Sequence, residues 1–295
     1  MHQRRPACET GPFCGILGVM PADTELDVDA FADALAGDEE GRKLLVLDAL
    51  QECDRRGPLP EPLLEPLLGC LGHRRKAVQR TAAEVLAQWS RITPDIRSRL
   101  LGRLGAPEPH ERWGAAFALA KIGPEPATLE VLLETLGQAD GDMRWAAQTI
   151  VVDLARRDPP IAAALVRLAG AGSAEQRKMA MYCLRDLGAP QPGLREVLAS
   201  ALAHASSDVR LAALSSLAAL YAEDGETVEP ILDLARDDAE PGVRRAAVST
   251  LGKLRPPAVW RERIARALDT AAGSGDASLR RAALGARRKL GEDEP

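Results

Sequence analysis

The stretch Asp208-Val-Arg-Leu-Ala-Ala-Leu-Ser-Ser-Leu217 decides the fold, because its pattern recurs along most of the chain. Counted from Arg210, the apolar stripe of a helix lies at offsets −1, +3, +7 and +10, which are Val209, Ala213, Leu217 and Leu220. The same frame returns around other long polar residues, which we call anchors. The anchors are Lys43, Gln79, Arg112, Arg144, Arg177, Arg210, Arg244 and Arg280. Their spacing of 32 to 36 residues indicates a repeated unit.

Further helix-forming stretches lie between the anchor helices, for example 126–136 and 194–202. Glycines followed closely by proline predict left-handed helix C-termini at Gly105, Gly123 and Gly188. Predicted helix starts are an N-cap followed by proline at Thr93-Pro94 and Asp158-Pro159, and a capping box formed by Ser173 with Gln176. Each period is therefore expected to be helix, turn, helix.

One hairpin of this length cannot bury its own apolar stripe, whereas stacked hairpins can. The sequence therefore predicts an all-α fold, a right-handed α-solenoid of about eight helical hairpins over residues 25–291. Residues 1–24 are expected to be a disordered N-terminal segment, and 292–295 an acidic tail. The anchor arginines and nearby aspartates are expected to be structural, with bonds between adjacent repeats.

The anchor frame Asp-x-Val-Arg-x-x-Ala-x-x-x-Leu, as it stands in Asp208–Leu217, resembles the HEAT repeat in its short bacterial form, which is also found in phycobilisome lyases. The resemblance covers about residues 26–291 and is specific for the fold. It implies an ARM/HEAT superhelix whose second helices line the concave side. The family includes scaffolds, adaptors, lyases and DNA-repair enzymes, so the resemblance does not select a function.

Composition and charge limit the classes of function. The 295 residues carry a net charge of −5, which does not favour a polyanion-binding protein. The charge is uneven, however: 13 acids face 4 bases over 23–65, and 10 bases face 3 acids over 253–290. Five scattered cysteines indicate reduced thiols and a cytoplasmic protein. No apolar run is long enough for a membrane helix. The protein is expected to be a monomer.

The candidate partner-binding residues lie at offsets +1, +5 and +8 from the anchors, opposite the apolar stripe. Four of the nine aromatic residues fall there in three consecutive repeats, and cations follow them towards the C-terminus. The candidates are Trp113, Phe117, Trp145, Lys178, Tyr182, Arg185, Arg245 and Arg281. Because Trp, Tyr and Arg dominate binding hot spots, this surface predicts a non-catalytic adaptor or scaffold that binds a protein or peptide with acidic residues. The alternative interpretation is that tryptophan at offset +1 packs along the next hairpin.

Two other classes of function stay open. Basic residues of the last repeats would suit a DNA-repair-like HEAT protein, but the residues four positions after Trp113 and Trp145 are Phe117 and Thr149, so the carboxylate of HEAT-like DNA glycosylases is absent. An accessory or lyase subunit for a bilin is the other class. A di-iron site like that of deoxyhypusine hydroxylase needs several His-Glu pairs, and His110-Glu111 is the one present. We therefore expect no metal, no cofactor and no enzyme activity.

Overall fold

The computed structural model describes residues 27–53 and 57–291, so the expectations for 1–24 and for the tail 292–295 lie outside the described residues. Every regular element in these ranges is a helix, which confirms the all-α prediction. Contacts between backbones divide the chain into two compact units, which we call unit 1 (Met1–Pro124) and unit 2 (Glu125–Pro295). None of the described helices has the length and apolar character needed to cross a membrane.

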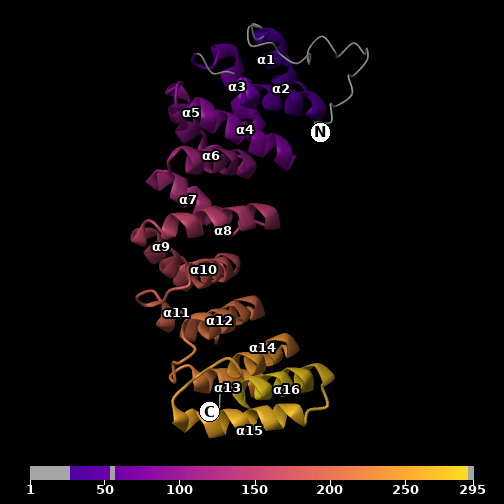
Figure 1. Cartoon of the computed structure of the whole chain (residues 1–295), viewed down its shortest axis with the longest axis vertical. Coiled ribbons are helices and arrows are strands. Elements are labelled where there is room, and N and C mark those ends of the chain that lie inside the picture. Colours follow the sequence, from indigo (N-terminus) through magenta and orange to yellow (C-terminus); the bar gives the residue numbers. More distant parts are fainter. Residues whose placement is uncertain (1–26, 54–56, 292–295) are drawn as a thin grey trace, which may run out of the picture. The chain divides into compact units, whose positions relative to one another are not determined.

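The described part of unit 1 forms three helical hairpins, in which an odd-numbered first helix precedes an even-numbered second helix (Figure 1). Its helices are α1 (Val28–Ala36), α2 (Glu40–Glu52), α3 (Glu61–Cys70), α4 (Lys76–Trp89), α5 (Asp95–Arg103) and α6 (Pro109–Ile122). The second helices α2, α4 and α6 pack on one another in chain order, and α1 packs on α3. Unit 1 is thus a short two-layer stack.

The described part of unit 2 forms five hairpins of the same kind. Its α-helices are α7 (Pro126–Thr135), α8 (Gly141–Ala155), α9 (Pro159–Ala171), α10 (Ala174–Leu187), α11 (Leu194–Ala201), α12 (Ser207–Leu220), α13 (Val228–Asp237), α14 (Pro241–Leu251), α15 (Arg261–Ala272) and α16 (Ala277–Gly291), and a 3-10 turn η1 (Ala258–Trp260) precedes α15. Figure 1 shows α8, α10, α12 and α14 following one another along the unit. Contacts between successive first helices are sparser than those between successive second helices.

The core of each stack is the predicted stripe. From the first repeat to the seventh, residues at offsets +3 and +7 are buried, for example Ala147 and Val151 in α8, or Ala213 and Leu217 in α12, whereas offset +7 of the last repeat is the exposed Arg287. The backbones of α14 and α16 approach closely at the end of α14. A Cβ added to Gly252 would lie 2.5 Å from the Cα of Ala286 in α16, so only glycine fits beside that helix.

Each anchor side chain donates to the turn that closes its own hairpin. Nη1 of Arg112, Arg144, Arg210 and Arg244 donates to the carbonyls six and five residues before it, at 2.5–3.2 Å. Arg177 donates to Gly172 and Arg280 to Ser274, while Gln79 and Lys43 donate to the carbonyls of Leu71 and Leu35 eight residues back. These carbonyls lie in the last turn of the first helix or just beyond it, where helical partners run out, so a long donor is needed at every anchor. The prediction that the anchors are structural is confirmed, but most of their bonds are within one hairpin.

Bonds to the next repeat come from three of the anchors as well, and the first is Gln79, which donates to the carbonyl of His110 in α6 at 3.3 Å. Arg210 forms a two-pronged pair with Asp238 of the next repeat, with N–O distances of 2.7 and 2.8 Å. Their side chains are only 11% and 4% exposed. Arg144 lies 3.1 Å from Glu175. Every anchor therefore bonds within its own hairpin, and these three also bond to the following hairpin.

Candidate functional site

Unit 2 contains two of the predicted aromatic contact residues, Trp145 and Tyr182, and Trp145 is the more exposed of them. It lies in the second turn of α8, whose N-cap Asp140 accepts the backbone N–H groups of Asp142 and Met143 at 2.8 and 3.1 Å. The opposite side of α8 is buried through Met143 and Ala147, which turns Trp145 outwards with 63% of its surface exposed. A large apolar ring is therefore held in solvent by a capped helix.

Tyr182 and Arg185 lie together on α10. The guanidinium carbon of Arg185 is 4.8 Å from the centre of the Tyr182 ring, a cation–π geometry. Arg185 also donates to the hydroxyl of Ser215 in α12 at 3.1 Å and pairs with Asp186 at 2.9 Å. Both side chains are half-buried, so this pair presents a firm rather than a mobile surface.

Lys178 is occupied by carboxylates of its own chain. Its Nζ lies 2.7 Å from Glu175 and 3.2 Å from Asp208, and the side chain is 17% exposed. Burial alone would lower the pKa of Lys178, but the hydrogen bonds and charges of the two carboxylates outweigh it and raise the pKa. The ammonium group therefore links α10 to the N-terminus of α12, which is a structural role.

Arg245 and Arg281 are exposed at the same offset on α14 and α16. Arg245 donates to the hydroxyl of Ser278 at 3.1 Å, two residues before the next anchor, as Lys178 does with Asp208. Arg281 has no ion-pair or hydrogen-bond partner within 27–53 and 57–291. The cationic end of the predicted surface is therefore present in unit 2, with Arg281 as its freest member.

Trp113 and Phe117 lie on α6 in unit 1. Trp113 is 4% exposed, and its ring centre is 5.5 Å from that of Phe117. Phe117 is half-buried beneath the ammonium of Lys121, which is 5.0 Å from the ring centre and 3.5 Å from Glu84. The sequence predicted one aromatic floor from Trp113 to Tyr182. The structure assigns the two α6 residues to unit 1 and the other six candidates to unit 2, and Trp113 follows the packing interpretation.

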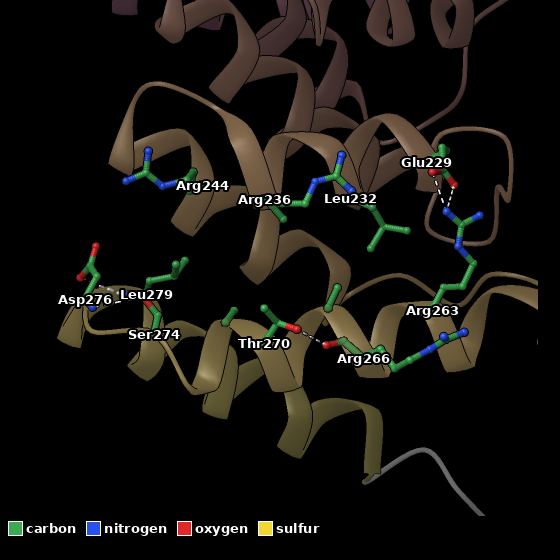
Figure 2. A pocket seen from close by; sticks show the side chains of 13 residues that line it. Glu229, Leu232, Arg236, Arg244, Arg263, Arg266, Thr270, Ser274, Asp276 and Leu279 are labelled. Atoms are coloured by element: carbon green, nitrogen blue, oxygen red, sulfur yellow. Dashed lines mark hydrogen bonds and ion pairs between the residues drawn. The ribbon is translucent and has the colours of Figure 1, made fainter.

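Sequence reasoning did not identify a cleft between α13 and α15 in unit 2. Its volume is about 620 Å³, and four arginines line it with an apolar floor (Figure 2). The excess of bases over 253–290 was a signal, but it could not show that arginines from α13, α14 and α15 meet. In the part of the chain that the structure describes, no group of three or more His, Cys, Asp or Glu side chains could hold a metal ion.

A family model described as HEAT repeats matches residues 64–151 and 194–288, more than half of the chain. This chain belongs to the HEAT-repeat family. The two matched regions include α4, α6, α12, α14 and most of α8, whose anchors donate to the turns of their own hairpins. None of the curated proteins matches the sequence.

Solved structures show the same fold at low sequence identity. Escherichia coli YibA is 16% identical with a TM-score of 0.53, and the match covers 99% of this chain and all of YibA. A triple mutant of Kap121p is 12% identical with a TM-score of 0.62 over 90% of this chain, which spans 34% of that protein. Human deoxyhypusine hydroxylase is 18% identical with a TM-score of 0.37, covering 90% and 96% of the two chains. The likenesses to YibA and Kap121p support the HEAT fold and say nothing of a partner.

Proposed function

We propose that this HEAT-repeat protein is a non-catalytic adaptor that binds a protein or peptide on the second-helix surface of unit 2. That surface consists of Trp145, Tyr182, Arg185, Arg245 and Arg281. The observation that carries the proposal is the exposure of Trp145, 63% of whose surface faces solvent although the helix is capped and packed. Exposed tryptophan on a rigid element loses little entropy when a partner covers it, which is why tryptophan dominates binding hot spots.

The charges of this surface support a partner with acidic residues. Arg245 and Arg281 are exposed on α14 and α16. Ser215 and Asp186 accept hydrogen bonds from only some of the N–H groups of Arg185. A carboxylate on the partner would complete these donors. The buried free thiols of Cys70 and Cys183 support a reducing compartment such as the cytoplasm.

The test compares Trp145→Ala with Trp113→Ala. The full chain is first used to purify its partner from native cells with and without nuclease, and the identified partner is then titrated. Trp145→Ala should weaken binding roughly 30-fold, because a hot-spot residue contributes about 2 kcal/mol, and should leave the melting temperature unchanged. Trp113→Ala should instead destabilise the fold by about 3–5 kcal/mol. Wild-type affinity of Trp145→Ala would refute the proposed surface.

Nucleic-acid binding is the second candidate function, and exposed cations on α16 favour it. Arg281, Arg288 and Lys289 are exposed. A nucleic acid held there would bind with an affinity that falls steeply with salt, since each phosphate contact releases a counterion. Arg281→Gln with Arg288→Gln should then reduce that salt dependence, and absence of DNA or RNA binding at low salt would remove this candidate.

A further inference from the structure

The cleft of unit 2 lies between two first helices, on the layer opposite to the proposed second-helix surface. It runs along α13 and α15, from Glu229 and Arg263 at one end to Ser274 and Asp276 at the other (Figure 2). Its volume of about 620 Å³ falls within the range of about 300–1,000 Å³ typical of ligand pockets. The space exists because α13 and α15 make few contacts and face each other with small residues.

The floor of the cleft is apolar. It is formed by Leu232 and Ala235 of α13, Ala267 and Ala271 of α15, and Leu279 of α16. Four of these, all but Ala267, are 7–9% exposed, so the core reaches the surface here without being sealed. An aliphatic side chain inserted between the two helices would cover this floor and gain about 25 cal/mol for each Å² of apolar surface removed from water.

Two of the four arginines on the rim are held by the protein. Arg263 pairs with Glu229 at 2.5 Å, and its guanidinium carbon is 5.1 Å from the ring centre of Trp260. Arg244 is the anchor of α14 and donates to the carbonyls of Asp238 and Ala239. These two fix the shape of the cleft, and their remaining N–H groups contribute to its positive potential.

The other two arginines are free to turn towards a ligand. Arg236 on α13 and Arg266 on α15 are 66% and 69% exposed at the side chain, and their ion-pair partners are near neighbours on their own helices. Such exposed pairs are weak and exchange readily for a better acceptor. Figure 2 shows these two side chains on opposite walls of the cleft. An acidic ligand between the two helices could therefore form one ion pair with each arginine.

We infer that this cleft binds an acidic peptide segment, in which an aliphatic side chain fills the apolar floor and flanking carboxylates pair with Arg236 and Arg266. Among the lining residues, four arginines face two carboxylates, Glu229 and Asp276, which matches a segment with two negative charges. The acids that pair with Arg236 and Arg266 are not part of the lining, and the carboxylates of the peptide would take their place. A nucleic acid fits less well, because none of the thirteen lining residues is aromatic and the two carboxylates would repel phosphates. This site goes beyond the proposed second-helix surface and does not depend on it.

The experiment uses the full chain and a short labelled peptide, blocked at both ends, in which two glutamates flank a leucine. Fluorescence anisotropy should show binding that weakens roughly tenfold when the glutamates become glutamines, or when Arg236→Gln and Arg266→Gln are combined. The matched control is Arg157→Gln with Arg167→Gln, which removes the same charge from exposed positions of unit 2 outside the cleft. It should bind the peptide like the wild type.

A second variant tests the floor without changing charge. Ala267→Phe projects a ring into the cleft from a half-exposed position, and it should abolish peptide binding while the circular-dichroism spectrum stays unchanged. Equal binding of the glutamate and glutamine peptides, or wild-type binding by the double arginine variant, would overturn the inference. Competition by a single-stranded oligonucleotide at lower concentration than the peptide would overturn it in favour of nucleic acid. Trp145→Ala should leave peptide binding intact, so failure here and failure of the proposed function are separate results.

Discussion

The anchor side chain shows how one residue per repeat closes a hairpin. Carbonyls at the end of a first helix have no partner within the helix, and leaving such groups buried without a bond costs free energy. A guanidinium satisfies two of them at once, as Arg112 does with Ala106 and Pro107 at 2.9 Å each. Glutamine and lysine at the first two anchors reach the carbonyl eight residues back instead. Length and donor capacity, rather than charge alone, define this position.

Arg210 is expected to be the most costly anchor to remove, because it also forms the buried pair with Asp238. Arg210→Ala leaves that buried carboxylate without its cation, with the Glu240 amide as its remaining donor, and it leaves two carbonyls without a donor, so the free energy of unfolding should fall by about 3–5 kcal/mol. Urea unfolding measures this loss. Arg99→Ala is the control, since Arg99 is 46% exposed in its pairs with Glu65 and Asp95, and its loss should be far smaller. Equal losses in the two variants would contradict the role given to Arg210.

Asp238 makes the stability of unit 2 depend on pH. Burial alone would raise the pKa of Asp238, but the hydrogen bonds from Arg210 and from the Glu240 amide outweigh it and lower the pKa. A lowered pKa means that the stabilisation is complete above the unfolded value of about 3.9 and is lost as the pH falls through the folded value. Asp238→Asn should therefore be less stable than the wild type near pH 7. Below about pH 4 the difference should shrink, which urea titrations at several pH values would show.

The buried thiol of Cys183 should be chemically silent in the folded protein. Burial, reinforced by the nearby Asp186 charge, raises the pKa of Cys183 to about 12, so the reactive thiolate is scarce at neutral pH. Iodoacetamide followed by peptide mass spectrometry should label Cys183 only after denaturant is added. Labelling of Cys183 under native conditions, at a rate like that of the denatured chain, would show that α10 opens readily.

The sequence predicted which side of its helix each candidate residue lies on, but it did not predict how deeply that residue is buried. Trp113 and Trp145 share offset +1, yet their exposed fractions are 4% and 63%. Offset fixes the direction of a side chain on its helix, whereas burial also depends on which neighbours cover it. Lys178 likewise was predicted to meet a partner, and the pairing with Asp208 thirty residues away could not be seen in its own repeat.

Helix boundaries were predicted well where a local bond decides them. The capping box of Ser173 with Gln176 is confirmed at α10, and Gly188 has the expected left-handed φ of 75°. Thr93 was predicted as an N-cap, but α5 begins at Asp95 after Pro94. The Thr93 hydroxyl instead accepts the amide of Leu59 at 2.8 Å, a distant partner that sequence spacing does not reveal.

Two further helix boundaries were predicted at Asp158 and Gly105. Asp158 is confirmed as the N-cap residue before Pro159 at α9, although its side chain makes no capping bond. Gly105 was predicted to be left-handed, but the glycines with positive φ in the described ranges are Gly123, Gly188 and Gly193. The chain at Gly105 turns with ordinary backbone angles, so the Gly–Pro pattern there marks a loop and not a left-handed cap.

Close packing between elements makes Gly114 sensitive to substitution. A Cβ at this position of α6 would collide with the carbonyl and Cβ of Leu71, which directly follows α3. Gly114→Ala should therefore destabilise unit 1 by about 1–3 kcal/mol, the usual cost of overpacking, although alanine favours helices. Gly102→Ala in the neighbouring α5 is the matched control, because its Cβ would meet open space. A gain of stability in both variants would contradict the packing argument.

The division into two units has a consequence for how damage spreads through the whole chain. In repeat proteins each hairpin is stabilised by itself and by its nearest neighbours. Gly114→Ala should therefore raise hydrogen exchange in α4 and α6 and leave α12 to α16 protected, and Arg210→Ala should do the reverse. Hydrogen-exchange mass spectrometry measures both patterns. A uniform increase along the chain would mean that the two units unfold as one.

The solenoid of repeats was predictable at the scale of the molecule because its evidence is periodic, and each anchor repeats the same physical requirement. The division after Pro124 was not predicted, since the spacing of Arg112 and Arg144 is as regular as elsewhere. How tightly two successive hairpins pack depends on the side chains that both of them supply, and the regular spacing of the anchors carries no information about those side chains. The cleft between α13 and α15 escaped prediction for the same reason.

The anchor bond that closes each hairpin on itself also bears on how such a chain changes over generations. A duplicated block of about 33 residues carries its own closing donor with it, so the new hairpin does not have to wait for a matching substitution in an older one. Pairs that cross between repeats, such as Arg210 with Asp238, work differently, since a copy inserted between them would separate the two partners. Duplication of a repeat is therefore easiest where neighbouring hairpins are joined by apolar packing alone. Insertion of a repeat is most constrained between Arg210 and Asp238, because it would break their buried ion pair.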